Sequence, residues 1–186
     1  MADSSAAALD RAHPLAGRSA ASAHVSVQPA EPAFRVSLRA RPEAVAAVGT
    51  ALGLDLPVKP KTSARSGSRA ALWLGPDEWL VIDTGASDPM SDLSGVEALH
   101  SAVDVSHRNT AIQVSGAGAE ATLNAGCPQD LSLAAFPVGA CSRTVLGKIE
   151  IVLWRTEARA FRVECWRSFS DYAFTLLALA ARDAGA

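Results

Sequence analysis

The chain has 186 residues, of which 49% are hydrophobic and 19% charged, so it can bury the core of one domain or of two small, closely packed halves. Its formal net charge is −2, with 17 Lys and Arg residues scattered among 19 Asp and Glu residues rather than gathered in the basic stripe of a nucleic-acid binding protein. Without an apolar run of about 18 residues or a signal-peptide pattern, we expect a cytoplasmic protein that does not enter a membrane.

The first 33 residues are rich in Ala, Ser and Pro and show no sustained hydrophobic period. This composition predicts a disordered or extended arm over residues 1–33, and one compact domain over residues 34–186. The domain begins with a strand, because apolar and polar side chains alternate over residues 34–40. A helix follows, with Pro42 in its first turn and Gly53 at its end.

The middle of the chain predicts a hairpin and two further strand–helix pairs. Residues 59–69 are a polar, basic loop, which is either a solvated connection or a contact with an acidic partner. Two apolar runs, 70–74 and 79–83, flank a Gly-Pro-Asp-Glu turn and predict a hairpin. The pattern then predicts a helix over 89–100, strands around 103–105 and 112–114, and a helix over 117–125.

The strongest structural signal lies near the C-terminus. Period-two alternation over residues 149–155 and 161–166 predicts a closing antiparallel hairpin. A helix capped by Ser168 follows, with an apolar stripe on one side. The stripe contains Phe169, Tyr172, Ala173, Leu176, Leu177 and Ala180. Together these elements predict an α+β fold of antiparallel sheets, with helices packed on one face, two similar β-α-β-β halves, and a closing hairpin plus C-terminal helix.

Two motifs resemble catalytic or cofactor sites. Residues 115–120 follow a strand and open a helix, as a dinucleotide loop does, but the third glycine and the parallel β-α-β context are missing. The glycines are better explained as turn and helix-start residues. Asp104, Ser106 and His107 are residue types of a catalytic triad, but neighbours in a strand point to opposite faces, which favours a turn histidine.

The positions of the His and Cys residues do not favour a metal site, a disulfide framework or a reactive thiol. The four histidines have no metal-ligand spacing, and the three cysteines are too widely spaced for a disulfide framework or a zinc knuckle. Cys127 could be a nucleophile, but no neighbour in sequence would lower its pKa, so a small buried residue is the preferred interpretation. We therefore predict no catalytic, cofactor-binding or metal-binding residue in this chain.

Aromatic and Arg side chains of the closing hairpin form the candidate binding surface. Trp154 and Trp166 lie on the strand face opposite the aliphatic one and could form an exposed patch. With the neighbouring Arg155 and Arg167 they have the residue types that desolvated protein interfaces favour. We predict that these four residues contact a partner.

An ordered series of short stretches resembles the gamma subunit of bacterial heterotetrameric sarcosine oxidase. The stretches lie at 72–80 (Leu-Trp-Leu-Gly-Pro-Asp-Glu-Trp-Leu), 104–108, 127–128, 130–131, 136–139, 143–144, 153–155 and 167–169. The Gly-Pro-Asp-Glu-Trp turn and the strand end at 104–107 also resemble the wider aminomethyltransferase folate-domain superfamily, of which the gamma subunit looks like a reduced relative.

The resemblance implies a non-catalytic structural role in a larger complex. It implies partners, the alpha, beta and delta subunits, which hold FAD, FMN, NAD and zinc, while the gamma chain has no known cofactor. The complex converts sarcosine to glycine, with hydrogen peroxide and either formaldehyde or methylenetetrahydrofolate as products. Two alternatives remain at this point: a scaffold for another complex, or a stand-alone folate-binding one-carbon protein with Asp77, Glu78 or Asp104 as its pterin-binding carboxylate.

Overall fold

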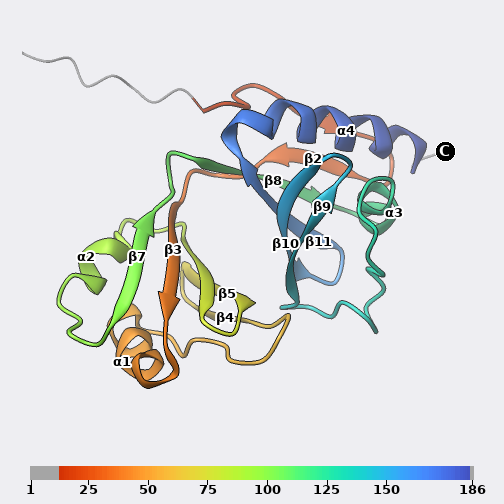
Figure 1. Cartoon of the computed structure of the whole chain (residues 1–186). Coiled ribbons are helices and arrows are strands. Elements are labelled where there is room, and N and C mark those ends of the chain that lie inside the picture. The colour runs from red at the N-terminus through yellow and green to blue at the C-terminus, as the bar shows by residue number, and fades with distance from the viewer. Residues whose placement is uncertain (1–12, 185–186) are drawn as a thin grey trace, which may run out of the picture.

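The computed structural model describes residues 13–184, which form two antiparallel β-sheets packed face to face with helices on their outer faces (Figure 1). One sheet has the order β1-β2-β8-β11-β10-β9, with strands β1 (Ala20–Ala21), β2 (Ser26–Pro29), β8 (Asn109–Ser115), β9 (Cys141–Leu146), β10 (Ile149–Glu157) and β11 (Ala160–Trp166). The other has the order β4-β5-β6-β3-β7, with β3 (Phe34–Ala40), β4 (Ser63–Ser66), β5 (Arg69–Gly75), β6 (Glu78–Asp83) and β7 (His100–Asp104). The helices are α1 (Pro42–Leu52), α2 (Pro89–Leu93), α3 (Ala119–Asn124), the 3-10 helix η1 (Arg167–Phe169) and α4 (Ser170–Asp183).

The two sheets repeat one topology. Each half of the chain runs from a strand through a helix into three strands, β3-α1-β4-β5-β6 and then β8-α3-β9-β10-β11. The strand orders match, because β4-β5-β6-β3 in one sheet corresponds to β9-β10-β11-β8 in the other. A further strand lies beside the first strand of each half, β7 beside β3 and β2 beside β8. The predicted α+β fold with two similar halves is confirmed.

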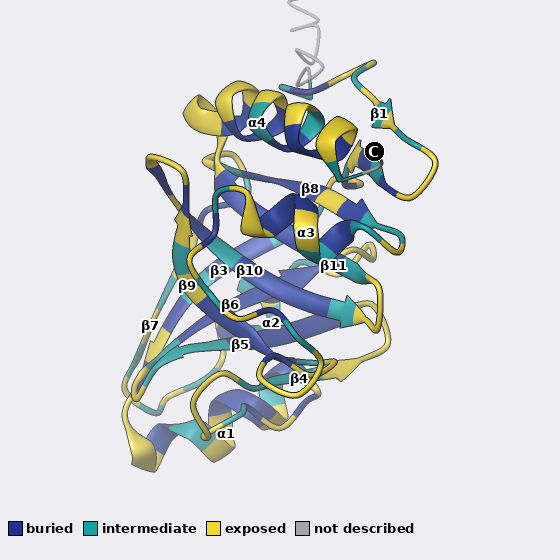
Figure 2. Ribbon diagram, turned by 90° about the vertical axis from the view of Figure 1, so that its right-hand side faces the viewer, coloured by how far each residue is buried: buried dark blue, intermediate teal, exposed yellow. Residues whose placement is uncertain are grey.

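Three apolar clusters separate the layers. One lies between the six-stranded sheet and helices α3 and α4, and a second lies between the five-stranded sheet and helices α1 and α2. The third lies between the two sheets and joins Leu72, Leu80 and Ile82 to Trp154. Figure 2 shows buried residues along the strands of both sheets and on the inward sides of the helices. Both faces of each sheet are therefore covered, which is the main feature that positions the side chains discussed below.

Local patterns predicted several elements well. Helix α1 starts with Pro42 and ends at Gly53, whose φ of 69° places it in the left-handed region that favours glycine. The hairpin β5–β6 is antiparallel, as the two apolar runs around the Gly-Pro-Asp-Glu turn predicted, and so is β10–β11, as its alternating side chains predicted. Residues 13–184 contain no helix that is both long and apolar enough to cross a membrane.

The predicted N-terminal arm is wrong for the part that the structure describes. Strand β2 pairs with β8 in the six-stranded sheet, with Val27 opposite Val114, and both Val25 and Val27 are buried. Leu15 is also fully buried in the cluster beneath α4. Because these few apolar residues lie in a low-complexity segment, its composition did not predict that each occupies a core position. The first 12 residues of the predicted arm lie outside the described residues.

Smaller corrections concern element boundaries. The predicted basic loop contains β4. The predicted helix over 89–100 ends at Leu93, and His100 already belongs to β7. Ser168 caps no helix; instead Phe169 precedes α4, and the Ser170 hydroxyl donates to the Arg167 carbonyl. The buried side of α4 is consequently shifted from the predicted stripe. It consists of Ser170, Ala173, Phe174, Leu177, Ala180 and Ala181.

Candidate functional site

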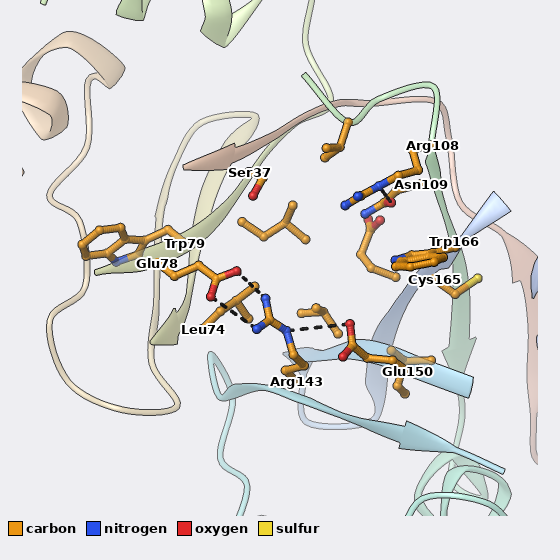
Figure 3. Close-up of a pocket in the computed structure, with 15 residues that line it drawn as sticks. Ser37, Leu74, Glu78, Trp79, Arg108, Asn109, Arg143, Glu150, Cys165 and Trp166 are labelled. Carbon is orange, nitrogen blue, oxygen red and sulfur yellow. Dashed lines mark hydrogen bonds and ion pairs between the residues drawn. The ribbon is translucent and has the colours of Figure 1, made fainter. Parts of the chain in front are cut away.

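A groove between the two sheets is bridged by ion pairs (Figure 3). Arg143 on β9 donates to Glu78 on β6, with 2.5 Å between Nη2 and Oε1, and lies 3.9 Å from a carboxylate oxygen of Glu150 on β10. Glu78 also pairs with Arg39 on β3 at 3.1 Å. The hydrogen bond with Glu78 raises the pKa of Arg143. The network therefore links strands of opposite sheets across the groove.

The groove is too small for a cofactor. Its volume is about 80 Å³. Sites for cofactors and drug-sized ligands usually measure about 300–1,000 Å³. The groove is smaller than such sites, and Glu78 links the two sheets through its pairs with Arg143 and Arg39.

A second group of charged residues is buried between the two sheets. Glu164 on β11 accepts from Arg35 Nε at 2.6 Å and from Arg162 Nε at 2.7 Å. All three residues are buried, with exposed fractions of 3% for Arg35, 5% for Arg162 and 1% for Glu164. Arg35 also donates to the carbonyl of Ala33. One carboxylate thus holds two guanidinium groups, one from each sheet.

Aromatic and basic side chains gather at the end of β11 and the start of α4. Trp166 stacks on Phe169 with 5.8 Å between ring centroids and 13° between ring planes, and the Arg108 guanidinium lies 5.3 Å from the Trp166 ring. Trp166 is 44% exposed and Phe169 is 40% exposed. Beside them is a hollow of about 520 Å³ lined by Pro14, Arg108, Trp166, Arg167 and Ser168. We call Arg108, Trp166, Arg167 and Phe169 the Trp166 patch.

Two of the four predicted interface residues are on the surface and two are not. Trp166 and Arg167 are exposed members of the Trp166 patch. Trp154 is only 8% exposed, because the face of β10 that carries it packs against the five-stranded sheet, and its Nε1 donates to Ser63 Oγ at 3.0 Å. Arg155 is fully buried on the opposite face and pairs with Glu120 of α3 at 2.9 Å. The prediction of an exposed surface is therefore wrong for Trp154 and Arg155, which make contacts inside this chain.

Sequence reasoning missed Arg108 and Phe169. Phe169 was assigned to the buried stripe of the last helix, but the 3-10 turn η1 brings it over Trp166, since residues three apart eclipse in that helix type. The Trp-Arg-Ser-Phe spacing at a helix start was the available signal. Arg108 gave no such signal, because it reaches Trp166 from the distant turn between β7 and β8.

The residues that resemble a triad form a turn. The Ser106 hydroxyl donates to Asp104 Oδ1 at 2.5 Å, and the Ser106 backbone N–H donates to the same oxygen at 2.8 Å. His107 is exposed in the connection that follows. Asp104 therefore stabilises the turn between β7 and β8, and the three side chains do not form the relay that hydrolysis needs.

The glycine-rich stretch serves the packing of the N-terminal strand. Gly116 has a φ of 116°, and a Cβ there would lie 2.2 Å from the carbonyl oxygen of His24. A Cβ at Gly118 would lie 2.6 Å from Val25 Cγ2. The close approach of His24 and Val25 explains both glycines without a ligand.

The cysteines are core residues. All three are free thiols and buried. Burial raises the pKa of Cys141 to about 12, and burial together with the neighbouring Glu164 raises the pKa of Cys165 to about 12. Cys127 is buried as well, with its Sγ 4.0 Å from Thr144 Oγ1. Among residues 13–184, no three His, Cys, Asp or Glu side chains are grouped so that they could hold a metal ion.

Comparison with known proteins identifies the family. The model of the sarcosine oxidase gamma subunit family matches residues 37–184. The chain belongs to the sarcosine oxidase gamma subunit family. A sarcosine oxidase subunit gamma from Arthrobacter sp. is 37% identical over 139 residues, which cover 70% of this chain and 67% of the relative.

Solved structures agree with this membership. A chain of the heterotetrameric sarcosine oxidase from Corynebacterium sp. U-96, solved with pyrrole 2-carboxylate, superposes with a TM-score of 0.82 and 29% identity, covering 87% of this chain and 86% of that one. The aminomethyltransferase of the glycine cleavage system from Bartonella henselae gives a TM-score of 0.64 at 15% identity, covering 87% of this chain and 50% of that one. The second match shows that the two chains share a fold.

Proposed function

We propose that this chain is a non-catalytic structural subunit of a heterotetrameric sarcosine oxidase, a complex that oxidatively demethylates sarcosine to glycine. The observation that carries the proposal is the match along 87% of the chain to a chain of such a heterotetramer, together with family membership over residues 37–184. The partners are then the alpha, beta and delta subunits. FAD, FMN, NAD and zinc belong to those partners.

The potentially reactive side chains of this chain are bonded to one another or buried, and this supports a structural role. Ser106 and Asp104 bond each other in a turn, Glu164 is held by two Arg residues, and Cys141 and Cys165 have raised pKa values that keep their thiols protonated near neutral pH. Three buried free thiols also fit a reducing compartment, and we place the complex in the cytoplasm.

The Trp166 patch is our proposed docking surface for another subunit of the complex. Trp and Arg are the residues in which binding energy concentrates at protein interfaces, and here a stacked Trp–Phe pair is flanked by an Arg guanidinium and an open hollow. The stacked rings are pre-organised, so little side-chain entropy is lost when a partner covers them. Covering an exposed Trp and Phe also gains the free energy of removing apolar surface from water.

Trp166→Ala tests the assignment. We expect assembly to weaken by about 2 kcal/mol or more, roughly thirtyfold in affinity, because Trp166 is the centre of the patch. The free energy of unfolding of the isolated chain should change by less, since almost half of the side chain is exposed. The matched control is Leu179→Ala, which removes an apolar side chain that is 57% exposed and lies on α4, outside the patch. Unchanged assembly in Trp166→Ala would remove the patch from the interface.

The stand-alone folate-binding alternative finds no support in the site geometry. Its candidate carboxylates are engaged, Asp77 with Arg39, Glu78 with Arg143 and Asp104 with Ser106. Calorimetry of the isolated chain with a reduced folate should give no saturable heat. Saturable binding would restore the alternative.

A further inference from the structure

Strand β7 has an open edge. It pairs with β3 on one side, and among residues 13–184 no strand pairs with its other side. In Figure 1 it lies at the left of the five-stranded sheet. Three of its five residues are exposed and the other two are half-buried. An open strand edge offers backbone N–H and C=O groups to a strand of another chain.

The hydrogen bonds beside this strand show which backbone groups face the open edge. The Val105 N–H donates to the Arg35 carbonyl at 2.8 Å, in register with the pairing of β7 and β3. In an antiparallel pair alternate residues bond the neighbouring strand, so Ser101 and Val103 direct their backbone groups to β3. Ala102 lies between them and therefore directs its N–H and C=O to the open edge.

The other half of the chain shows what occupies the equivalent place. Strand β2 lies beside β8 as β7 lies beside β3, and β2 has a further partner, β1. Ala20 of β1 lies opposite Val27 of β2, and the Ser22 N–H donates to the Val25 carbonyl at 2.8 Å. Among residues 13–184, β1 has no counterpart beside β7. The repeat therefore predicts the place of one added strand.

The residues of this edge favour pairing. Residues 100–103 (His-Ser-Ala-Val) lack the Lys and Pro that commonly prevent edge strands from pairing. Strand β7 keeps a continuous register with β3 over its whole length. Val103 is 53% exposed, and Leu99, directly before the strand, is 70% exposed. An added strand with apolar side chains would remove both from water.

The open edge is continuous with the Trp166 patch. The turn that follows β7 contains Arg108, whose carbonyl accepts from the Arg167 N–H at 2.7 Å. The Arg108 guanidinium lies 5.3 Å from the Trp166 ring. A partner that covers the patch therefore lies next to the end of β7.

We propose that another subunit of the complex adds an extended segment to β7, as a sixth strand of this sheet. Backbone hydrogen bonds to Ala102 hold the segment, and its apolar side chains cover Leu99 and Val103. The segment takes the place that β1 occupies in the other sheet. This inference rests on the proposed function, because it describes how a partner subunit binds beside the Trp166 patch.

Ala102→Pro tests the added strand in the co-expressed complex. Proline removes the N–H that faces the open edge and leaves the bonds of Ser101 and Val103 to β3 in place. We expect co-elution with the other subunits to weaken at least about tenfold in a dilution series. The matched control is Val145→Pro on the edge strand β9, which should assemble like the wild type. Urea unfolding of each variant separates a loss of fold from a loss of assembly.

The control is matched in backbone geometry. The Arg155 N–H donates to the Ala140 carbonyl at 2.9 Å, in register with the pairing of β9 and β10. By the same alternation the Val145 N–H points away from β10, as the Ala102 N–H points away from β3. Both substitutions thus place proline at an outward-facing position of an edge strand.

Hydrogen exchange in the wild-type complex provides a second measurement that needs no variant. The Ala102 amide should exchange at least about a hundredfold more slowly than in an unstructured peptide, because a strand-paired amide is protected. Exchange near the unstructured rate, or equal assembly of Ala102→Pro and Val145→Pro, would overturn the added strand while the wild type still assembles. A wild-type chain that binds no other subunit would overturn the proposed function as well. An isolated chain that elutes as a dimer, with its Ala102→Pro variant a monomer, would assign the edge to a second copy and also overturn the proposal.

Discussion

Replacing Glu164 with Gln should destabilise the chain more than any other conservative change at a charged residue. Gln keeps the shape of the side chain but removes the charge that accepts from Arg35 at 2.6 Å and from Arg162 at 2.7 Å. Two guanidinium groups, each at most 5% exposed, would then remain between the sheets without a counter-charge. Breaking a buried ion pair by removing one partner costs about 3–5 kcal/mol, and total stabilities are only about 5–15 kcal/mol.

Urea unfolding followed by tryptophan fluorescence measures this loss. With a slope of about 2 kcal/mol per M, the urea midpoint should fall by about 2 M. Glu150→Gln is the matched control, because Glu150 lies on the neighbouring strand, its side chain is 59% exposed, and its 3.9 Å pair with Arg143 should contribute less than about 1 kcal/mol. A second removal, Arg162→Met in the Glu164→Gln background, should recover part of the stability. If Glu164→Gln cost less than about 1 kcal/mol, the charge cluster would not hold the sheets together as described.

Two further predictions concern the interior of the six-stranded sheet. Gly116→Ala should lower the free energy of unfolding by about 2 kcal/mol or more, because its Cβ would lie 2.2 Å from the His24 carbonyl oxygen. The control Gly95→Ala, with open space around it, should change this free energy very little. Equal effects of the two substitutions in chemical unfolding would contradict the packing of β2 on β8. Burial raises the pKa of Cys165 from 9.0 to about 12, so its contribution to stability is fully present below pH 9 and is lost as the pH rises toward 12. At pH 10 the loss should be on the order of 1 kcal/mol. Cys165→Ala should therefore lose less stability than the wild type between pH 8 and pH 10 in urea unfolding, and an identical pH dependence would place the thiol in a solvated site.

Sequence patterns predicted those parts of the fold whose information is local. Helix α1 carries its own start and stop at Pro42 and Gly53, and the alternation over β10 and β11 defines their pairing. Strand β2 was missed, because its four residues contain a single buried Val and become a strand only by pairing with β8. Short strands of this kind are specified by the partner strand and not by their own composition.

Two of the four predicted surface residues, Trp166 and Arg167, are exposed, and the other two are buried for a physical reason. Alternation tells which side chains share a face of a strand, but it does not tell what covers the other face. In this fold the second face of β10 meets another sheet, so Trp154 is buried, whereas Trp166 at the end of β11 remains exposed. The contacts of Arg108 with Trp166 and of Arg35 with Glu164 join distant segments, and a single sequence carries no local signal for such pairs.

Co-purification of the tagged chain from its native host tests whether it is a subunit of sarcosine oxidase. We expect three further subunits to elute with the chain in equal amounts. The eluate should show flavin absorbance and should release hydrogen peroxide when sarcosine is added. A colourless chain that elutes alone and releases no peroxide with sarcosine would contradict the assignment as a subunit of sarcosine oxidase.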